Sequence, residues 1–339
     1  MSRTVERIWA GRAGWAMVVR AALEPAGLLY GGLTGLRNAL YDRGVLRVTP
    51  PPMPTVSVGN LTVGGTGKTP VAAWMAGELA RRGARPAVVL RGHGGDEPHV
   101  HTVLNPAVGV IVDPDRVRAL RHAAASGHDV AVLDDGFQHR RAGRTADVVL
   151  VSADSWSEPL RLLPAGPWRE SLAGLRRATA VVVTRKATSR ADASALVRRL
   201  TPRTQGGLGV VVHLGLGPLS DFVGGDSLPL DALRGKSILV AAGIGNPAAL
   251  SAQLTELGAR VTERPFPDHH VYTPSDTRIL ATEGTRYDVF LCTLKDAVKL
   301  GPLWPRGAGP LWYVSQRVEL EEGSAGLLAL LDHLVDART

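Results

Sequence analysis

The pattern of apolar and polar positions predicts alternating strands and helices through the middle of the chain. Short runs of consecutive apolar residues are typical of strands buried on both faces of a parallel sheet, and longer amphipathic segments are typical of helices. The expected strands are residues 55–58, 86–90, 129–133, 147–151 and 180–184, and the expected helices are residues 71–82, 116–126 and 191–200. This order predicts a doubly wound parallel sheet of the α/β class.

A second alternating pattern follows and predicts a smaller α/β domain. The proline-rich stretch 49–54 marks a boundary, so the first domain is expected to cover residues 49–205. Residues 206–235 are rich in glycine and are interpreted as a linker, although residues 210–213 have a strand-like pattern. The second domain is then expected over residues 236–339 and ends in a helix. Its expected elements are strands at 237–242, 287–292 and 311–314 and a helix at 248–257.

The segment 1–48 has a different pattern, in which large apolar residues are interleaved with arginines. Trp9 and Trp15 lie in this segment, and Glu24 and Pro25 interrupt its middle. The longest uncharged run, residues 25–36, is too short to cross a bilayer. We expect amphipathic helices that lie in the headgroup plane of a membrane. The alternative is a pair of N-terminal helices packed on the main domain.

A glycine-rich turn stands between the first expected strand and the first expected helix. It consists of Thr62, Val63, Gly64, Gly65, Thr66, Gly67, Lys68 and Thr69. Such a turn presents backbone N–H groups to phosphate oxygens, with the lysine near the β- and γ-phosphates and the threonine hydroxyl on Mg²⁺. The pattern departs from the usual one at Thr62, where a glycine is expected, so a plain glycine turn is the alternative. The turn predicts nucleotide triphosphate chemistry.

Two adjacent acids follow the expected strand at residues 129–133. Asp134 and Asp135 stand about 70 residues after the glycine-rich turn. An acid at the carboxyl end of a strand beside a phosphate loop is a usual partner of Mg²⁺. A solvated turn before Gly136 is the alternative.

Composition narrows the class of protein. Cys292 is the only cysteine among 339 residues, which excludes a disulfide framework and a cysteine-based zinc site and points to the cytosol. The formal net charge is +8, and lysine occurs only at positions 68, 186, 236, 295 and 299, so arginine supplies most of it. The positive charge reflects either a compositional bias towards arginine or a function in which the protein is attracted to an anionic surface. Few aromatic residues interleave with the arginines, which argues against stacking on single-stranded nucleic acid.

Several motifs together resemble one enzyme family along essentially the whole chain. They are residues 57–70 (SVGNLTVGGTGKTP), 95–98 (GDEP), 134–139 (DDGFQH), 163–170 (LPAGPWRE), 243–247 (GIGNP), 266–270 (FPDHH) and 295–299 (KDAVK). In this order they resemble the tetraacyldisaccharide 4′-kinases, the lipid A 4′-kinases. One departure is that the string at residues 91–94 runs directly into residues 95–98, with His93 where the family has tyrosine, which shortens the loop before Asp96.

The resemblance implies a function and roles for individual residues. The family uses ATP and Mg²⁺ to phosphorylate the 4′-hydroxyl of a lipid A disaccharide precursor, at the cytoplasmic face of the bacterial inner membrane. A peripheral association with the anionic membrane surface and no nucleic-acid partner are therefore expected. By position, Lys68 and Thr69 are the phosphate-loop pair, Asp134 and Asp135 are acids on the metal side, and Asp96 is the base, assisted by His269. The expected lining residues are Gln138, His139, Arg169 and Glu170.

Some of these residues have simpler interpretations. Asp96 and Glu97 could form a solvated loop. Lys295 and Lys299 lie one helical turn apart and either bind phosphate or belong to a capped surface helix. Asp268, His269 and His270 have no evident third metal ligand nearby, so an acid–base or wall role is favoured over a metal cluster.

Three other functions compete with the lipid kinase. One is another small-molecule kinase or synthetase with the same phosphate loop. Another is a membrane-surface switch ATPase of the partitioning type, against which Val63 argues, since that class has lysine just before the two glycines. The third, a nucleic-acid-binding ATPase, rests only on the positive charge.

Overall fold

A computed structural model of the chain describes residues 13–92, 95–245, 247–268 and 270–338, together with Val5, Ile8, Trp9 and Gly11. These residues form two compact units. The larger unit contains residues 13–92, 101–213 and 318–338, and the smaller unit contains residues 95–100 and 214–317.

The larger unit is built on a parallel sheet in the strand order β7-β6-β5-β1-β4-β2-β3. Its strands are β1 (Thr55–Asn60), β2 (Pro86–Leu90), β3 (Gly109–Val112), β4 (Val130–Asp134), β5 (Ala146–Ser152), β6 (Ala180–Arg185) and the first part of β7 (Leu208–Asp221). In β1, β2, β4 and β5 every residue is buried, as the apolar runs predicted. The central strand β1 pairs with both β4 and β5. Its carboxyl end therefore lies between the carboxyl ends of these two parallel neighbours.

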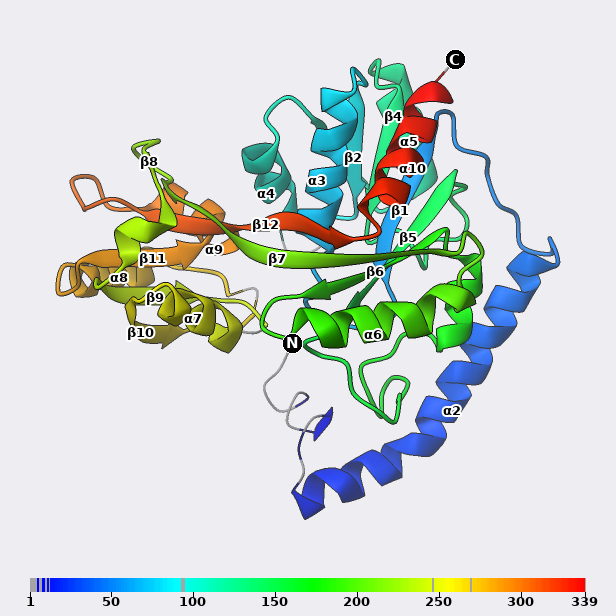
Figure 1. Cartoon of the computed structure of the whole chain (residues 1–339), viewed down its shortest axis with the longest axis horizontal. Helices are drawn as coiled ribbons and strands as arrows, with labels where there is room; N and C mark the ends of the chain where they lie inside the picture. The colour runs from blue at the N-terminus through cyan, green and yellow to red at the C-terminus, as the bar shows by residue number, and fades with distance from the viewer. Residues whose placement is uncertain are drawn as a thin grey trace. The chain divides into compact units, whose positions relative to one another are not determined.

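Helices cover both faces of this sheet. They are α3 (Lys68–Arg81), α5 (Arg116–Ala125), α6 (Arg190–Leu200), the second half of α4 (Glu97–Leu104) and α10 (Ser324–Asp336). The α5 side of the core contains Ala87 and Val89 from β2, whereas the intervening Val88 points to the opposite face and is also fully buried. α3 packs on β1, β2 and β4, and α10 lies beside α3 (Figure 1), where Arg82 and Asp332 form an ion pair. The predicted doubly wound α/β fold is therefore confirmed.

In the smaller unit, parallel strands pair in the order β10-β9-β11-β12. Its strands are β9 (Ser237–Ala242), β10 (Arg260–Pro265), β11 (Val289–Thr293) and the first part of β12 (Trp312–Glu322), and β8 (Ser227–Leu228) pairs with β7. Its helices are α7 (Pro247–Glu256), α8 (Pro274–Gly284) and α9 (Leu294–Leu300). Two apolar clusters fill the space on the two sides of the strands, one with Leu254 of α7 and the other with Leu280 of α8 and Leu300 of α9.

The predicted linker at residues 206–235 is wrong, because nearly half of it is the 14-residue strand β7. Val210, Val211 and Val212 of this strand are fully buried. The glycines obscured the strand: Gly209 and Gly217 stand where an added side chain would collide with Thr201 and Ser315. Strands β7 and β12 each run from one unit into the other, and α10 belongs to the larger unit. The predicted second domain, 236–339, is therefore too long at its carboxyl end.

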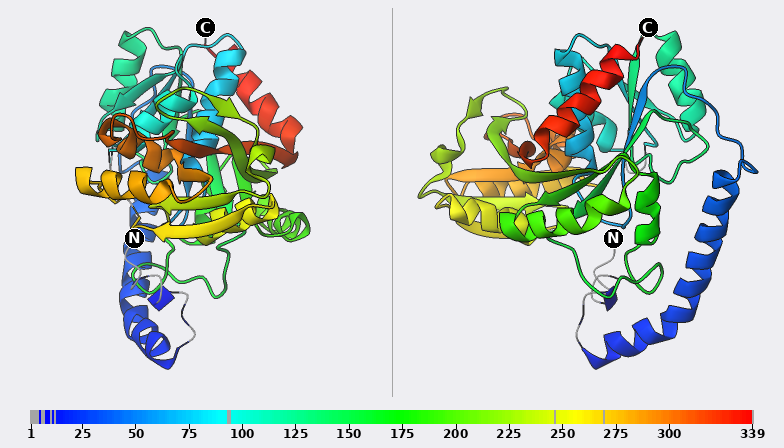
Figure 2. Two further views of the ribbon diagram at one scale, coloured as in Figure 1. Left: turned by 90° about the vertical axis from the view of Figure 1, so that its left-hand side faces the viewer. Right: turned by 45° about the vertical axis from the view of Figure 1, so that its right-hand side comes forward.

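The N-terminal segment forms one long helix, α2 (Gly14–Asp42), which continues through Pro25. The expected interruption at Glu24 and Pro25 is therefore wrong. Figure 2 shows that the helix bends part-way along, as helices that contain proline commonly do. Glutamate is a good helix former, so Glu24 is compatible with a continuous helix, and its carboxylate pairs with Arg161 at 2.7 Å. Among the described residues, no helix is both long and apolar enough to cross a membrane.

Candidate active site

The glycine-rich turn lies between β1, which ends at Asn60, and α3, which begins at Lys68. Gly64 has φ 120° and Gly67 has φ 85°, and these are backbone conformations that residues with side chains rarely adopt. Gly67 is the N-cap of α3, and the first two helical residues are Lys68 and Thr69. The turn therefore presents the amino-terminal N–H groups of a helix together with a lysine and a threonine hydroxyl.

Neighbouring segments hold this turn in place. Thr66 accepts a hydrogen bond from Asn60 at its hydroxyl (2.9 Å), and its carbonyl accepts one from the Thr184 hydroxyl (2.9 Å). Residues 61–63 also pair with residues 167–169: Val63 N donates to Pro167 O at 2.7 Å, and Arg169 N donates to Leu61 O at 2.7 Å. Thr62, which replaces the usual glycine, forms the β-bridge to Trp168 at the centre of this pairing.

The pairing places Arg169 beside the second of the two acids. Asp135 lies 3.2 Å from Arg169 Nη1 and 3.7 Å from Lys68 Nζ, so one carboxylate joins two cations at the edge of the turn. Asp135 has φ 55°, a left-handed conformation that is uncommon for a residue with a side chain. Its side chain is 40% exposed. Lys68, Asp135 and Arg169, three residues proposed from the sequence, are thus brought together.

Asp134, the first of the two acids, contacts a different residue. Asp134 ends β4 and is buried, and its Oδ2 lies 2.9 Å from Nε2 of the buried His101 on α4. The sequence did not reveal His101 as a partner, because a single histidine in a short helix carries no recognisable pattern. The described residues contain no cluster of three or more histidine, cysteine, aspartate or glutamate side chains that could hold a metal ion. A cation at this turn would thus depend on Thr69, Asp134 or Asp135 and on oxygens of a bound nucleotide and water, which suits Mg²⁺.

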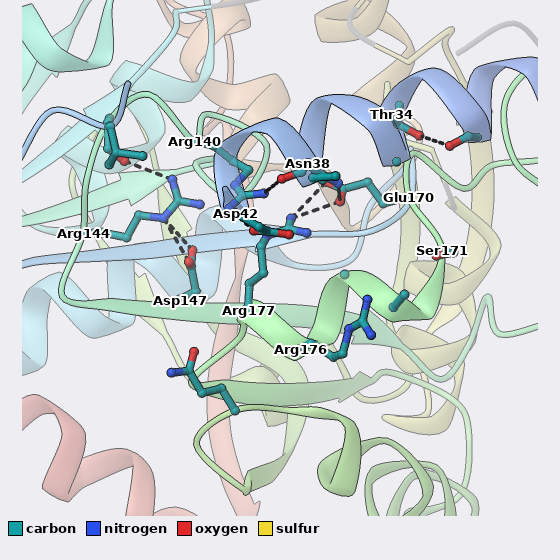
Figure 3. Close-up of a pocket in the computed structure, with 18 of the residues that line it drawn as sticks. Thr34, Asn38, Asp42, Arg140, Arg144, Asp147, Glu170, Ser171, Arg176 and Arg177 are labelled. Atoms are coloured by element: carbon teal, nitrogen blue, oxygen red, sulfur yellow. Dashed lines mark hydrogen bonds and ion pairs between the residues drawn. The ribbon is translucent and has the colours of Figure 1, made fainter. Parts of the chain in front are cut away.

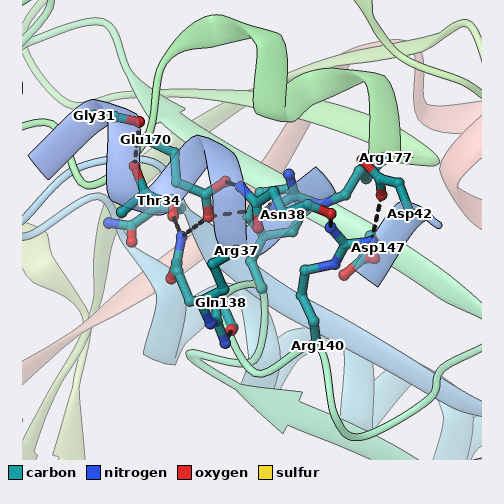
Figure 4. A network of polar contacts seen from close by, with 12 residues as sticks. Gly31, Thr34, Arg37, Asn38, Asp42, Gln138, Arg140, Asp147, Glu170 and Arg177 are labelled. Atoms are coloured by element: carbon teal, nitrogen blue, oxygen red, sulfur yellow. Dashed lines mark hydrogen bonds and ion pairs between the residues drawn. The ribbon is translucent and has the colours of Figure 1, made fainter. Parts of the chain in front are cut away.

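Glu170 connects three segments of the larger unit (Figure 4). Its carboxylate accepts hydrogen bonds from Asn38 Nδ2 of α2 (2.7 Å), Arg177 Nη2 (3.0 Å) and Gln138 Nε2 (3.2 Å). Gln138 Nε2 also donates to Asn60 O at 2.9 Å, immediately before the glycine-rich turn. Glu170 is buried. Through these hydrogen bonds it links α2 to the base of the turn.

A pocket of about 670 Å³ lies beside this network in the larger unit (Figure 3). α2 forms one wall through residues such as Thr34 and Asn38, and four arginines from other segments are among the remaining lining residues. Arg140 binds Asn38 O and Asp42, and Arg144 binds Asp147 at 2.9 Å. The remaining arginines of the lining are Arg176 and Arg177.

His139, another expected lining residue, is half-buried beside these arginines. Burial, reinforced by the positive charge of Arg116, lowers the pKa of His139, so the ring is neutral at physiological pH. A neutral ring offers one donor and one acceptor rather than a positive charge.

Asp96 lies in the smaller unit, directly before α4, and is only 2% exposed. The alternative of a solvated loop is therefore wrong for Asp96. Lys299 Nζ of α9 lies 4.0 Å from Asp96 Oδ2, which places one of the two lysines noted in the sequence beside the expected base. His269, the expected assistant of Asp96, lies outside the described residues.

The comparison with protein families shows to which family this chain belongs. The family described as tetraacyldisaccharide-1-P 4′-kinase matches residues 19–336. The chain belongs to this family. The resemblance read from the motifs is thus confirmed.

Individual relatives agree with this membership. The tetraacyldisaccharide 4′-kinase of Bdellovibrio bacteriovorus is 33% identical over 336 residues, which cover 91% of this chain and 97% of that protein. The corresponding enzyme of Anaeromyxobacter dehalogenans is 37% identical over 324 residues, covering 88% and 86%. Among solved structures, LpxK from Aquifex aeolicus in complex with ATP has a TM-score of 0.73 at 29% identity, covering 94% of this chain and 99% of that one.

Proposed function

We propose that the protein transfers the γ-phosphoryl group of ATP to the 4′-hydroxyl of a lipid A disaccharide 1-phosphate precursor, a step of lipid A biosynthesis. The observation that carries the proposal is the arrangement at the glycine-rich turn, where Lys68 and Arg169 meet Asp135 at the carboxyl ends of the central strands. The chain that carries this turn belongs to the tetraacyldisaccharide 4′-kinase family over almost its entire length.

The larger unit supplies the groups that phosphoryl transfer from ATP requires. The N–H groups at the start of α3 hold phosphate oxygens, and Lys68 and Arg169 offset negative charge on the transferring group. Thr69, Asp134 and Asp135 are the residues we assign to Mg²⁺, which when bound neutralises phosphate charge. Gln138, His139 and Glu170 are assigned to the wall of the site, with Glu170 acting through Gln138 on the base of the turn.

Asp96 is assigned as the general base. In the reaction, a bond forms between the acceptor oxygen and the γ-phosphorus, the bond to the β–γ bridging oxygen breaks, and ADP leaves. The proton of the hydroxyl passes to the carboxylate of Asp96. We retain His269 as the residue that assists Asp96, on the basis of the family resemblance alone.

The exposed side of α2 supports a peripheral position on a membrane. Between Ala13 and Leu36 every exposed residue is uncharged and apolar, including Val18, Leu29 and Leu33. Two polar residues of the helix bind other segments of the larger unit instead: Glu24 binds Arg161, and Asn38 binds Glu170. Because this arrangement is the reverse of a helix facing water, we propose that the outer side of α2 lies in the headgroup region. The lipid substrate favours the cytoplasmic face of the bacterial inner membrane.

The direct test is incubation of the purified protein with ATP, Mg²⁺ and lipid A disaccharide 1-phosphate, followed by mass spectrometry of the lipid. We expect the mass to rise by one phosphate group, and we expect chelation of Mg²⁺ to prevent this. ATP hydrolysis that is stimulated by vesicles but adds no phosphate to the lipid would contradict the proposal and favour a switch ATPase.

A further inference from the structure

Asp296 of the smaller unit is a fully buried acid with an unusually complete set of partners. Its carboxylate accepts hydrogen bonds from Tyr272 OH (2.9 Å), Thr293 Oγ1 (2.7 Å) and the backbone N–H of Gly243 (3.2 Å). A side chain at Gly243 would come within 2.9 Å of Asp296 Oδ1, so glycine is what permits the close approach. Burial, reinforced by the charge of Asp296, raises the pKa of Tyr272, which keeps the phenol protonated as a donor.

Lys299 lies between this acid and the expected base. Its Nζ is 3.8 Å from Asp296 Oδ1 and 4.0 Å from Asp96 Oδ2, and it stands over the Tyr272 ring, 5.5 Å from the ring centre. Lys299 and Asp296 come from one turn of α9, whereas Asp96 lies directly before α4, about two hundred residues earlier in the chain. The side chain of Lys299 is 17% exposed, so little water screens these contacts.

We propose that Lys299 is a positioning residue for phosphoryl transfer: anchored by Asp296, its ammonium group keeps the Asp96 carboxylate ionised and oriented towards the acceptor hydroxyl. The proposal rests on the proposed function, in which Asp96 is the base. Lys299 contacts Asp96, and its effect on the reaction passes through that carboxylate.

Electrostatics explain why the buried Asp96 carboxylate needs a cation beside it. A carboxyl group that is 2% exposed loses hydration of its charged form, which favours protonation and would disable it as a base. A cation at about 4 Å favours the ionised form. Among the described residues, Asp296, Tyr272 and the buried Cys292 lie around Lys299, and Glu97 follows Asp96 as the first residue of α4. Burial raises the pKa of the Cys292 thiol, so Cys292 is neutral. Asp296 balances the charge of Lys299 and fixes its position, while the neutral phenol of Tyr272 adds no competing charge.

The test compares pH profiles of kcat for the wild-type protein, Lys299→Met and Lys299→Arg. Methionine retains an unbranched apolar chain but has no charge, so we expect the acid limb of the profile to move upward by about one to three pH units. The KM for ATP is expected to change less than about twofold, because the nucleotide groups lie on the larger unit. Lys299→Arg keeps the charge and is expected to restore most of the wild-type profile. Lys236→Met, the same exchange at an exposed position of the smaller unit, is the matched control and should behave as wild type.

A second variant provides an independent measurement. Lys299→Cys can be alkylated with 2-bromoethylamine, which rebuilds an ammonium side chain, whereas the native Cys292 is buried and protected. We expect the unmodified variant to show the shifted acid limb and the alkylated one to regain the wild-type limb.

The outcomes separate this inference from the proposed function. If the wild-type protein adds no phosphate to the disaccharide, the proposed function fails. If the wild type is active, an unshifted acid limb in Lys299→Met overturns the inference, even where kcat falls equally at every pH. Failure of the neutral variants to fold, judged by Tm, together with no recovery in Lys299→Arg, would show a purely structural role and would also overturn it.

Discussion

The outer side of α2 offers the sharpest test of membrane association. Leu29 and Leu33 lie one turn apart on this side and are 66% and 59% exposed. We choose the double variant Leu29→Gln with Leu33→Gln, because glutamine is a good helix former and leaves the helix intact while removing apolar surface.

The expected loss of binding follows from the exposed fractions. Full burial of a leucine side chain is worth about 1.5–3 kcal/mol. Since roughly two thirds of each side chain remains to be buried, each leucine contributes about 1–2 kcal/mol on entering the headgroup region, and the pair about 2–4 kcal/mol. This corresponds to a loss of about 30- to 1000-fold in the vesicle partition coefficient.

Co-sedimentation with phospholipid vesicles measures this coefficient directly, with anionic and zwitterionic vesicles compared in parallel. The control is Val223→Gln with Ile279→Gln, two aliphatic residues of the smaller unit that are 61% and 50% exposed. We expect the α2 variant to lose vesicle binding and to show a higher KM for the lipid, with unchanged ATP binding. Wild-type partitioning by the α2 variant would refute the reasoning, and an equal loss in the control would show that general surface hydrophobicity, not α2, drives binding.

Three further predictions concern the site itself. Lys68→Ala should lower kcat by about 10²–10³-fold in the lipid kinase assay without unfolding the protein, as expected for loss of a group that neutralises transition-state charge, and near-normal turnover would contradict the assignment. Asp96→Asn should lower kcat by about 10²–10⁴-fold with ATP affinity roughly unchanged, and a wild-type kcat would place the base elsewhere. Burial lowers the pKa of His139 below its usual 6.5, so the unfolded chain binds this proton first as pH falls, and stability should decrease below that value. Thermal unfolding at about pH 7.5 and about pH 5.5 should therefore show a smaller acid-induced fall in Tm for His139→Gln than for the wild type, and an equal fall would refute this.

Much of the larger unit could be predicted because its signals are local. A buried parallel strand is a continuous apolar run, so β2 was predicted with its observed bounds. The prediction for α6 has the observed end and starts one residue late. The glycine-rich turn was recognisable because a phosphate-binding loop needs glycines at fixed spacing with lysine and threonine at the helix start. The elements that were missed are short or have mixed polarity: α4 has only eight residues, and β10 is largely exposed.

The sequence by itself determined the class of fold, the phosphate loop and the family to which the chain belongs, since these depend on residue types at short spacing. Only the tertiary structure decided that Asp135 joins Lys68 and Arg169, that Asp134 turns to His101, and that Lys299 lies beside Asp96. It also decided that α2 turns its polar side to the protein and its apolar side outward. The reason is physical: local periodicity specifies helices and strands, whereas the order and packing of those elements bring together side chains that lie far apart in the chain.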